Sequence, residues 1–254
     1  MTRRRFYAPL SAFDSSLTRI TLASDEARHL REVLRLKVGD EVYVFNGAGK
    51  EFQCTVEETR REAAHLMVVR EVDPARAESR LHLTLAVALL KAEKFDLVVQ
   101  KATELGVYDV VPVMTKLADI RLRNESDSAK RLARWQRIAR EAAKQSGRAV
   151  VPVIAAPVHF QTIVHETATE PGMRRLMFSE RNGQPLPAAT ELLPSKGLPL
   201  TALVGSEGGW TDEEIAIARE AGWTIVTLGG RTLRAETAAI AVTVLLQHLA
   251  GDLV

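Results

Sequence analysis

From about residue 81 onward, short apolar runs alternate with longer segments in which apolar residues recur every three or four positions. Leu81–Leu90 is a nearly continuous apolar run, which is typical of a strand buried on both faces of a parallel sheet. In the next segment Phe95, Val98 and Ala102 fall on one face of a helix, and Gly106 follows where a left-handed C-terminal cap belongs. The pattern therefore predicts a strand followed by a helix.

The same alternation continues to the end of the chain. Further strands are expected at Asp109–Met114, Leu176–Ser179, Thr201–Val204 and Thr224–Leu228. Further helices are expected at Ser126–Ser146, Asp212–Ala221 and Ala235–Leu249. The buried face of the first of these helices is expected to contain Leu132, Trp135, Ala139 and Ala142. Because strands and helices alternate, the predicted fold class is α/β with a mainly parallel sheet.

The first 72 residues instead show short strand patterns separated by turns. The strand patterns cover Glu41–Phe45, Glu51–Glu57 and Ala64–Val72. Ser24 is expected to cap a short helix over Asp25–Leu34, with Leu30, Val33 and Leu34 as its apolar stripe. Short strands joined by tight turns suggest a small β-barrel. We therefore expect one domain over residues 1–72 and a second, beginning with a linker, over residues 73–254.

The composition is that of a protein with a substantial core. Hydrophobic residues make up 46% of the 254 residues, and 34 basic residues nearly balance 32 acidic ones. The single cysteine, Cys54, excludes an intrachain disulfide, and the six histidines show no metal-ligand spacing, so no metal is expected. The most apolar stretch, Ala238–Leu246, is too short to span a bilayer, and Met1–Pro9 does not resemble a signal peptide. We expect a cytoplasmic protein that does not bind membranes.

The first candidate site is the glycine-rich segment Val204–Trp210, which follows an apolar strand. Glycines let the backbone approach a ligand closely and adopt positive φ. Thr211 and Glu214 have the spacing of a capping box, so a helix should begin directly after the loop. In open α/β sheets ligands bind at the carboxyl ends of the strands, where this loop lies. A tight strand–helix turn that binds nothing would show the same pattern.

The second candidate is Leu228–Ala238, which also follows an apolar strand and contains Arg231, Arg234 and Glu236. The arginines would equally suit a solvated helix entrance, and the carboxylate would suit the positive end of the helix dipole. Two glycine loops on successive strands are nevertheless harder to explain as turns alone. Neither loop matches the dinucleotide-binding pattern G-x-G-x-x-G.

Basic residues are concentrated in two parts of the chain. Between residues 116 and 148 there are ten basic residues and only four acidic ones. A second group lies near the N-terminus and includes Arg3, Arg4, Arg5, Arg28, Arg31, Arg35 and Lys37. Such runs often form only a solvated helix face. Because both halves of the chain have them, binding of nucleic-acid phosphates is the favoured interpretation.

Several segments together resemble the RsmE family of SPOUT-superfamily methyltransferases, which methylate N3 of a uridine in 16S ribosomal RNA. The segments that carry the resemblance are Arg4–Tyr7, His29–Asp40, Gln100–Val107, Glu141–Arg148 and the two glycine loops. They span nearly the whole chain, and their order and spacing are specific. One residue departs from the family pattern: Ser206 stands where the family usually has proline, which implies a less rigid turn.

The resemblance implies a SPOUT-type knotted parallel sheet with helices on both faces, plus a small N-terminal PUA-like β-barrel. It implies S-adenosylmethionine as the cofactor, 16S ribosomal RNA of the small subunit as the substrate, and a homodimer. The residues implied to bind the cofactor are Ser179, Leu203, Gly205, Ser206, Glu207, Gly208, Leu228, Gly229, Leu233, Arg234, Thr237 and Ala238.

Within this interpretation Arg234 stabilises the negative uracil edge or a phosphate, and Glu207 or Glu236 accepts a proton. The residues expected to bind RNA are Arg3, Arg4, Arg5, Arg28, Arg31, Arg35, Lys37, Lys91, Arg121 and Arg123. Two alternatives remain open from the sequence: another SPOUT enzyme that methylates the ribose 2′-oxygen, and a non-catalytic RNA-binding factor in ribosome assembly.

Overall fold

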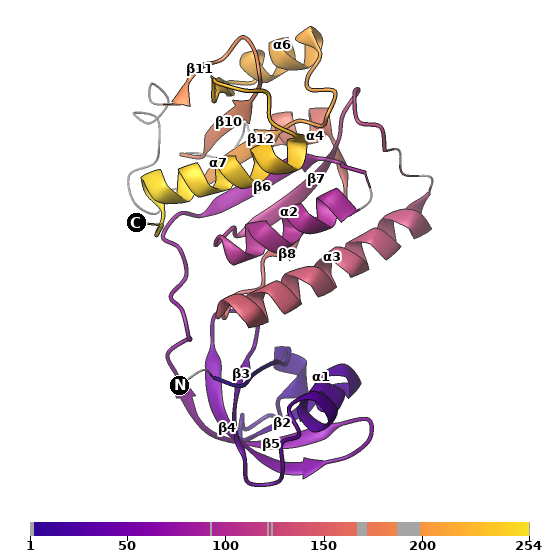
Figure 1. Ribbon diagram of the computed structural model, residues 1–254, viewed down its shortest axis with the longest axis vertical. Coiled ribbons are helices and arrows are strands. Elements are labelled where there is room, and N and C mark those ends of the chain that lie inside the picture. The colour runs from indigo at the N-terminus through magenta and orange to yellow at the C-terminus, as the bar shows by residue number, and fades with distance from the viewer. Residues whose placement is uncertain are drawn as a thin grey trace. The chain divides into compact units, whose positions relative to one another are not determined.

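A computed structural model describes residues 3–91, 93–120, 122, 124–166, 172–186 and 199–253 (Figure 1). By their contacts the residues form two compact units. The N-terminal unit combines residues 1–78 with 140–151, and the C-terminal unit combines residues 79–139 with 152–254. The predicted boundary between residues 72 and 73 stays a prediction.

The N-terminal unit contains a five-stranded sheet in the order β1-β3-β4-β5-β2. Its strands are β1 (Arg5–Tyr7), β2 (Arg19–Leu22), β3 (Glu41–Phe45), β4 (Glu51–Thr59) and β5 (Ala64–Val72). All neighbours are antiparallel except β1 and β3. Two register shifts in the β4–β5 ladder bend the sheet, which agrees with the predicted barrel-like curl.

The short helix of this unit differs from the prediction. A 3₁₀ turn η1 (Leu10–Ala12) precedes it, and α1 (Ser24–Arg28) continues into a π-helical turn η2 (His29–Val33). Ser24 is the first helical residue, with Ala23 in the cap position, so the predicted cap is wrong. The wider π turn keeps Leu30 in the core but leaves Val33 65% and Leu34 37% exposed, so the predicted apolar stripe is confirmed at Leu30 and wrong at Val33 and Leu34.

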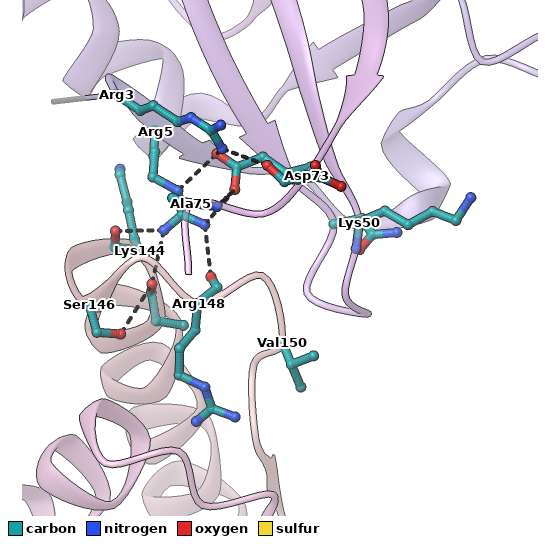
Figure 2. Close-up of polar contacts among 12 residues, drawn as sticks. Arg3, Arg5, Lys50, Asp73, Ala75, Lys144, Ser146, Arg148 and Val150 are labelled. Atoms are coloured by element: carbon teal, nitrogen blue, oxygen red, sulfur yellow. Dashed lines mark hydrogen bonds and ion pairs between the residues drawn. The ribbon is translucent and has the colours of Figure 1, made fainter. Parts of the chain in front are cut away.

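A buried ion pair ties the end of a long helix to the N-terminal sheet. The last residues of α3 (Glu125–Ser146) belong to this unit. Arg5 donates two hydrogen bonds to the fully buried Glu51 carboxylate, both at 3.1 Å. Its guanidinium also donates to the carbonyl oxygens of Ala143, Lys144 and Arg148 (Figure 2).

Two of the acceptors, Ala143 and Lys144, lie in the last turn of α3, whose backbone carbonyl groups have no following turn to bond. Arg5 is only 7% exposed, and its donors are engaged inside the protein. A phosphate would have to displace a buried carboxylate to reach Arg5, so these contacts do not support the predicted RNA contact of Arg5, which stays a prediction.

The C-terminal unit is built on a parallel sheet in the order β11-β13-β10-β12-β6-β7-β8, with β9 paired to β7. Its strands are β6 (Leu83–Ala88), β7 (Asp109–Met114), β8 (Val153–Ile154), β9 (Val158–His159), β10 (Arg174–Phe178), β11 (Gln184–Pro185), β12 (Leu200–Val204) and β13 (Thr224–Thr227). Its helices, besides most of α3, are α2 (Glu93–Glu104), α4 (Phe160–Glu166), α6 (Asp212–Glu220) and α7 (Ala235–Ala250).

Helices cover both faces of this sheet (Figure 1). On one face α4 and α6 pack on the strands through a cluster that includes Phe160, Trp210, Ile215 and Trp223. On the other, α7 contacts β6, β12 and α2. The predicted α/β class is confirmed. Trp135, Ala139 and Ala142 of α3 are buried as predicted, whereas Leu132 is only half-buried.

No helix within the described residues is both long and apolar enough to cross a membrane.

Candidate active site

Three neighbouring parallel strands, β13, β10 and β12, end at the same edge of the sheet. The residues that follow them enclose a cavity of about 250 Å³. Ser179 and Glu180 follow β10, Gly205–Trp210 follow β12, and Leu228–Leu233 follow β13. Ala235, Ala238 and Val242 of α7 complete the lining. The two glycine loops predicted from the sequence therefore line one cavity at the carboxyl ends of the strands, where open α/β sheets bind ligands.

Trp210 fixes the shape of the first loop. Its indole Nε1 donates a 2.8 Å hydrogen bond to the carbonyl of Phe178, the last residue of β10. A side chain at Gly205 would place its Cβ 3.0 Å from the indole ring, so any larger residue would push the indole out of its position. The turn is closed by a 2.9 Å hydrogen bond from the Gly209 N–H to the Ser206 carbonyl oxygen.

The helix after the first loop begins as predicted. Thr211 and Glu214 form a capping box at the N-terminus of α6. The Glu214 carboxylate is 2% exposed and also accepts the backbone N–H of Lys116, which follows β7. The next residue, Leu117, lies so close to Gly208 that a Cβ there would be 2.8 Å from its own Cβ. The segment that follows β7 thus packs against the first loop and the helix that follows it.

The second loop is open where the first is crowded. Gly229 and Gly230 have φ of +76° and +73°, which few L-residues adopt. A Cβ at either position would meet no atom within 4 Å, so both leave space beside the cavity that they line. Arg234 then takes the N-cap position of α7 in an extended conformation, and its side chain is exposed.

Lys94 of α2 connects the two loops electrostatically. Its Nζ lies 2.6 Å from Oε1 of Glu207 in the first loop and 3.6 Å from Oε2 of Glu236 in α7. Burial by itself would raise the pKa of Glu207, but the hydrogen bond and charge of Lys94 outweigh burial and lower that pKa. The same hydrogen bond raises the pKa of Lys94. Both groups are therefore charged at neutral pH.

Most of the residues predicted to bind the cofactor lie together around this cavity. Those that line it are Ser179, Gly205, Ser206, Glu207, Gly208, Leu228, Gly229, Leu233 and Ala238. Leu203 does not: its side chain is buried in the cluster under α4 and α6. Arg234 and Thr237 are exposed and lie outside the lining.

Two charged residues at this site were not predicted. Glu180 lines the cavity, and its position directly after a predicted strand was a usable signal. Lys94 lies 113 residues from Glu207 in the sequence, on a different helix, and no local pattern connects the two. Only the tertiary structure brings them together.

The residues fit a polar organic cofactor. The hydroxyl oxygen of Ser206, which lines the cavity and is 7% exposed, is buried without a hydrogen-bond partner among the described residues. Buried polar groups usually have partners, so this atom suits a hydrogen bond to a ligand. Among the same residues no three His, Cys, Asp or Glu side chains gather as a metal site would require.

The cations predicted to bind RNA differ in their availability. Arg4, Arg28, Arg35 and Lys37 are exposed. Arg31 donates to the carbonyls of Arg60 and Arg61 and pairs with Glu32, Arg3 pairs with Glu51, and Lys91 pairs with Asp119. Arg121 and Arg123 lie outside the described residues.

Comparison with known families agrees with this architecture. The RNA methyltransferase domain family matches residues 77–247, and the RNA methyltransferase PUA domain family matches residues 22–68. A ribosomal RNA small subunit methyltransferase E from Synechocystis is 34% identical over 94% of this chain and 75% of its own length. The same-named protein of Bacillus subtilis is 28% identical over 87% of this chain and 86% of its own.

Solved structures extend the similarity to the whole chain. A ribosomal RNA small subunit methyltransferase E from Neisseria gonorrhoeae, bound to S-adenosyl methionine, matches with a TM-score of 0.86 and 32% identity over 100% of both chains. A methyltransferase from Legionella pneumophila in complex with the same cofactor matches with a TM-score of 0.87 and 28% identity over 99% of this chain and 100% of its own.

These matches define the class first: an RNA methyltransferase of SPOUT-type fold with a PUA-like N-terminal domain. Within that class, the chain belongs to the ribosomal RNA small subunit methyltransferase E family.

Proposed function

We propose that this protein transfers a methyl group from S-adenosylmethionine to N3 of a specific uridine in the 16S ribosomal RNA of the small subunit. The observation that carries the proposal is the cavity between the two glycine loops, in a chain whose relative from Neisseria gonorrhoeae was solved with S-adenosyl methionine. When bound, the cofactor supplies an electrophilic methyl group.

The backbone of the two loops would hold this cofactor, with the Ser206 hydroxyl as an additional hydrogen-bonding group. Glycines at 229 and 230 leave space for the ligand, while Trp210 and Leu117 keep the first loop in place. Such positioning contributes about 7–11 kcal/mol to a two-substrate reaction when the reacting atoms are well aligned.

Uridine N3 carries a proton in the neutral base and becomes nucleophilic only when that proton leaves. Glu207 is a weak proton acceptor, because its lowered pKa reflects a carboxylate already stabilised by Lys94. Glu236 is the better candidate: its Oε2 lies 3.6 Å from Nζ of Lys94, farther than the Glu207 carboxylate does, and it is buried without a hydrogen-bond partner among the described residues. Arg234, exposed at the start of α7, would stabilise the negative charge that develops on the uracil.

The exposed cations of the PUA-like domain would bind the phosphates of the RNA backbone. Arg4, Arg28, Arg35 and Lys37 are the exposed members of the predicted set in this domain. Phosphate contacts of this kind position the RNA and make its binding sensitive to salt. The target base must also leave its stack to enter the cavity.

We further propose that the protein is a cytoplasmic homodimer. Val244 and Leu249 of α7 are 38% and 44% exposed, and Leu97 of α2 is 39% exposed. Since α2 and α7 contact each other, these side chains belong to one helical layer that a second copy of the chain would cover.

Transfer of a labelled methyl group tests the proposed activity. Small ribosomal subunits from a strain without this enzyme are incubated with the protein and methyl-labelled S-adenosylmethionine. Label is expected in the 16S RNA, and it should be absent with Gly208→Val, because the valine side chain collides with Leu117 and closes the loop. Subunits that are bound but remain unlabelled would instead identify a non-catalytic assembly factor.

A further inference from the structure

Glu180 is a carboxylate of the cavity with no role in the function proposed so far. It stands two residues after the end of β10, lines the cavity, and is exposed. A Cβ at Gly209 would lie 2.7 Å from its Oε1 and 3.2 Å from its Oε2, so the carboxylate lies directly over the first loop. Glycine at 209, with φ of +67°, leaves room for it there.

Two nearby cations, Arg181 and Lys94, are engaged elsewhere. Arg181 donates a 2.8 Å hydrogen bond to the Trp210 carbonyl and pairs with Asp212. Lys94 pairs with Glu207 and Glu236. Within the part of the chain that the structure describes, no Lys, Arg or His nitrogen lies within 4 Å of the Glu180 carboxylate.

The charges that line the cavity suit a ligand with both signs. Glu207 is neutralised by Lys94, which leaves the carboxylate of Glu180 and the guanidinium of Arg231. S-adenosylmethionine has a sulfonium and an α-ammonium, both positive, and one negative carboxylate. We infer that Glu180 binds the cationic part of S-adenosylmethionine through its carboxylate; the inference rests on the proposed function. Coulomb attraction is stronger beside a partly enclosed cavity than in bulk water.

The test is the cofactor affinity of Glu180→Gln, measured by calorimetry. This change keeps the size of the side chain and removes only its charge. The dissociation constant for S-adenosylmethionine should rise about 10-fold, in the range for a lost hydrogen bond to a charged group. Binding of 5′-methylthioadenosine, which has neither cation, should stay within about twofold. Glu220→Gln, an exposed carboxylate on α6 outside the lining, is the matched control and should bind the cofactor as the wild type does.

S-adenosylhomocysteine, which keeps the ammonium but not the sulfonium, separates the two cations. An equal loss for both ligands assigns Glu180 to the ammonium, and a loss confined to S-adenosylmethionine assigns it to the sulfonium. Unchanged binding of S-adenosylmethionine, or an equal loss for 5′-methylthioadenosine, overturns the inference. A wild-type protein that binds no S-adenosylmethionine would overturn the proposed function itself, which is a distinguishable result.

Discussion

At the scale of single residues, the cavity is lined by a tightly packed loop and by one buried hydroxyl without a hydrogen-bond partner among the described residues. Leu117 leaves no room for a side chain at Gly208, and Trp210 packs tightly against Gly205. Ser206, between them, leaves its hydroxyl buried without a partner among the described residues. The family usually has proline here, so the serine exchanges backbone rigidity for a hydrogen-bonding group. That exchange has measurable consequences.

Replacing Ser206 with alanine should change stability and binding in opposite directions. An unsatisfied buried hydroxyl costs about 1–3 kcal/mol, so Ser206→Ala should raise the melting temperature of the cofactor-free protein. The same variant should bind S-adenosylmethionine about 3- to 10-fold more weakly, because it loses one hydrogen bond. Differential scanning calorimetry and titration calorimetry measure the two effects.

Ser179→Ala is the contrasting variant for stability. Ser179 is equally buried, at 7% exposure, but its hydroxyl accepts the backbone N–H of Arg181 at 3.2 Å. Its loss should therefore lower the melting temperature. A lower melting temperature for Ser206→Ala as well would mean that the Ser206 hydroxyl has a structural partner rather than a ligand.

Arg234 should matter for turnover and not for cofactor binding. Its exposed side chain lies outside the cavity lining, at the N-cap of α7. Arg234→Ala should lower the rate of methyl transfer by at least about 100-fold, as loss of a charge-stabilising donor does, while the cofactor dissociation constant stays nearly constant. Unchanged turnover in single-turnover assays would remove Arg234 from the mechanism.

At the scale of elements, local pattern predicted the strands better than the helix near the N-terminus. β3, β5 and β7 begin and end at the residues predicted from polar–apolar alternation and from apolar runs. A strand with one buried face has an apolar residue at every second position, and a strand buried on both faces is apolar throughout. The π turn over His29–Val33 and the partners of Lys94 have no such periodic signal. They depend on packing and on contacts between residues far apart in the sequence.

Lys94 links α2 to the first loop and to α7, and its removal should produce a stability loss that depends on pH. In Lys94→Met the pKa of Glu207 should rise, because its stabilising partner is lost. A carboxyl group whose pKa is lowered by folding stabilises the fold fully at any pH above its ordinary, unfolded-state pKa. That stabilisation disappears as the pH falls through the lowered pKa. The difference in melting temperature between variant and wild type should thus be largest near neutrality and shrink below about pH 4.

Lys101→Met is the matched control for this measurement, because Lys101 is on the same helix but pairs with Glu104 away from the cavity. Its turnover should equal that of the wild type, whereas turnover of Lys94→Met should fall. A loss of stability in Lys94→Met that is the same at every pH would contradict the assigned ion pair.

Arg5 joins β1 to the end of α3, and its loss should destabilise the N-terminal domain strongly. Arg5→Met leaves the Glu51 carboxylate buried without its bidentate partner and uncaps three carbonyl groups. Removing one member of a buried pair costs about 3–5 kcal/mol. Arg4→Met, an exposed neighbour, should stay within about 0.5 kcal/mol of the wild type in the same urea titration. Equal stability of the two variants would refute this role of Arg5.

At the scale of the whole molecule, the hydrophobic pattern, the glycine motifs and the charges of the sequence predicted an α/β protein with two ligand loops at one sheet edge and basic groups in both halves. The identities of the cofactor and of the uridine came only from the resemblance, because a glycine loop that binds through backbone groups does not show which ligand it binds. Family membership is now established by matches that cover nearly the whole chain. The trefoil knot and the homodimer stay predictions.

The most direct test of the account is the identity of the methylated nucleoside. After reaction with small subunits that lack this modification, the 16S RNA is digested to nucleosides and analysed by mass spectrometry. We expect 3-methyluridine from the wild-type protein, and formation at least about 100-fold slower with Arg234→Ala. A methyl group on a ribose 2′-oxygen, or on any base atom other than uridine N3, would contradict it.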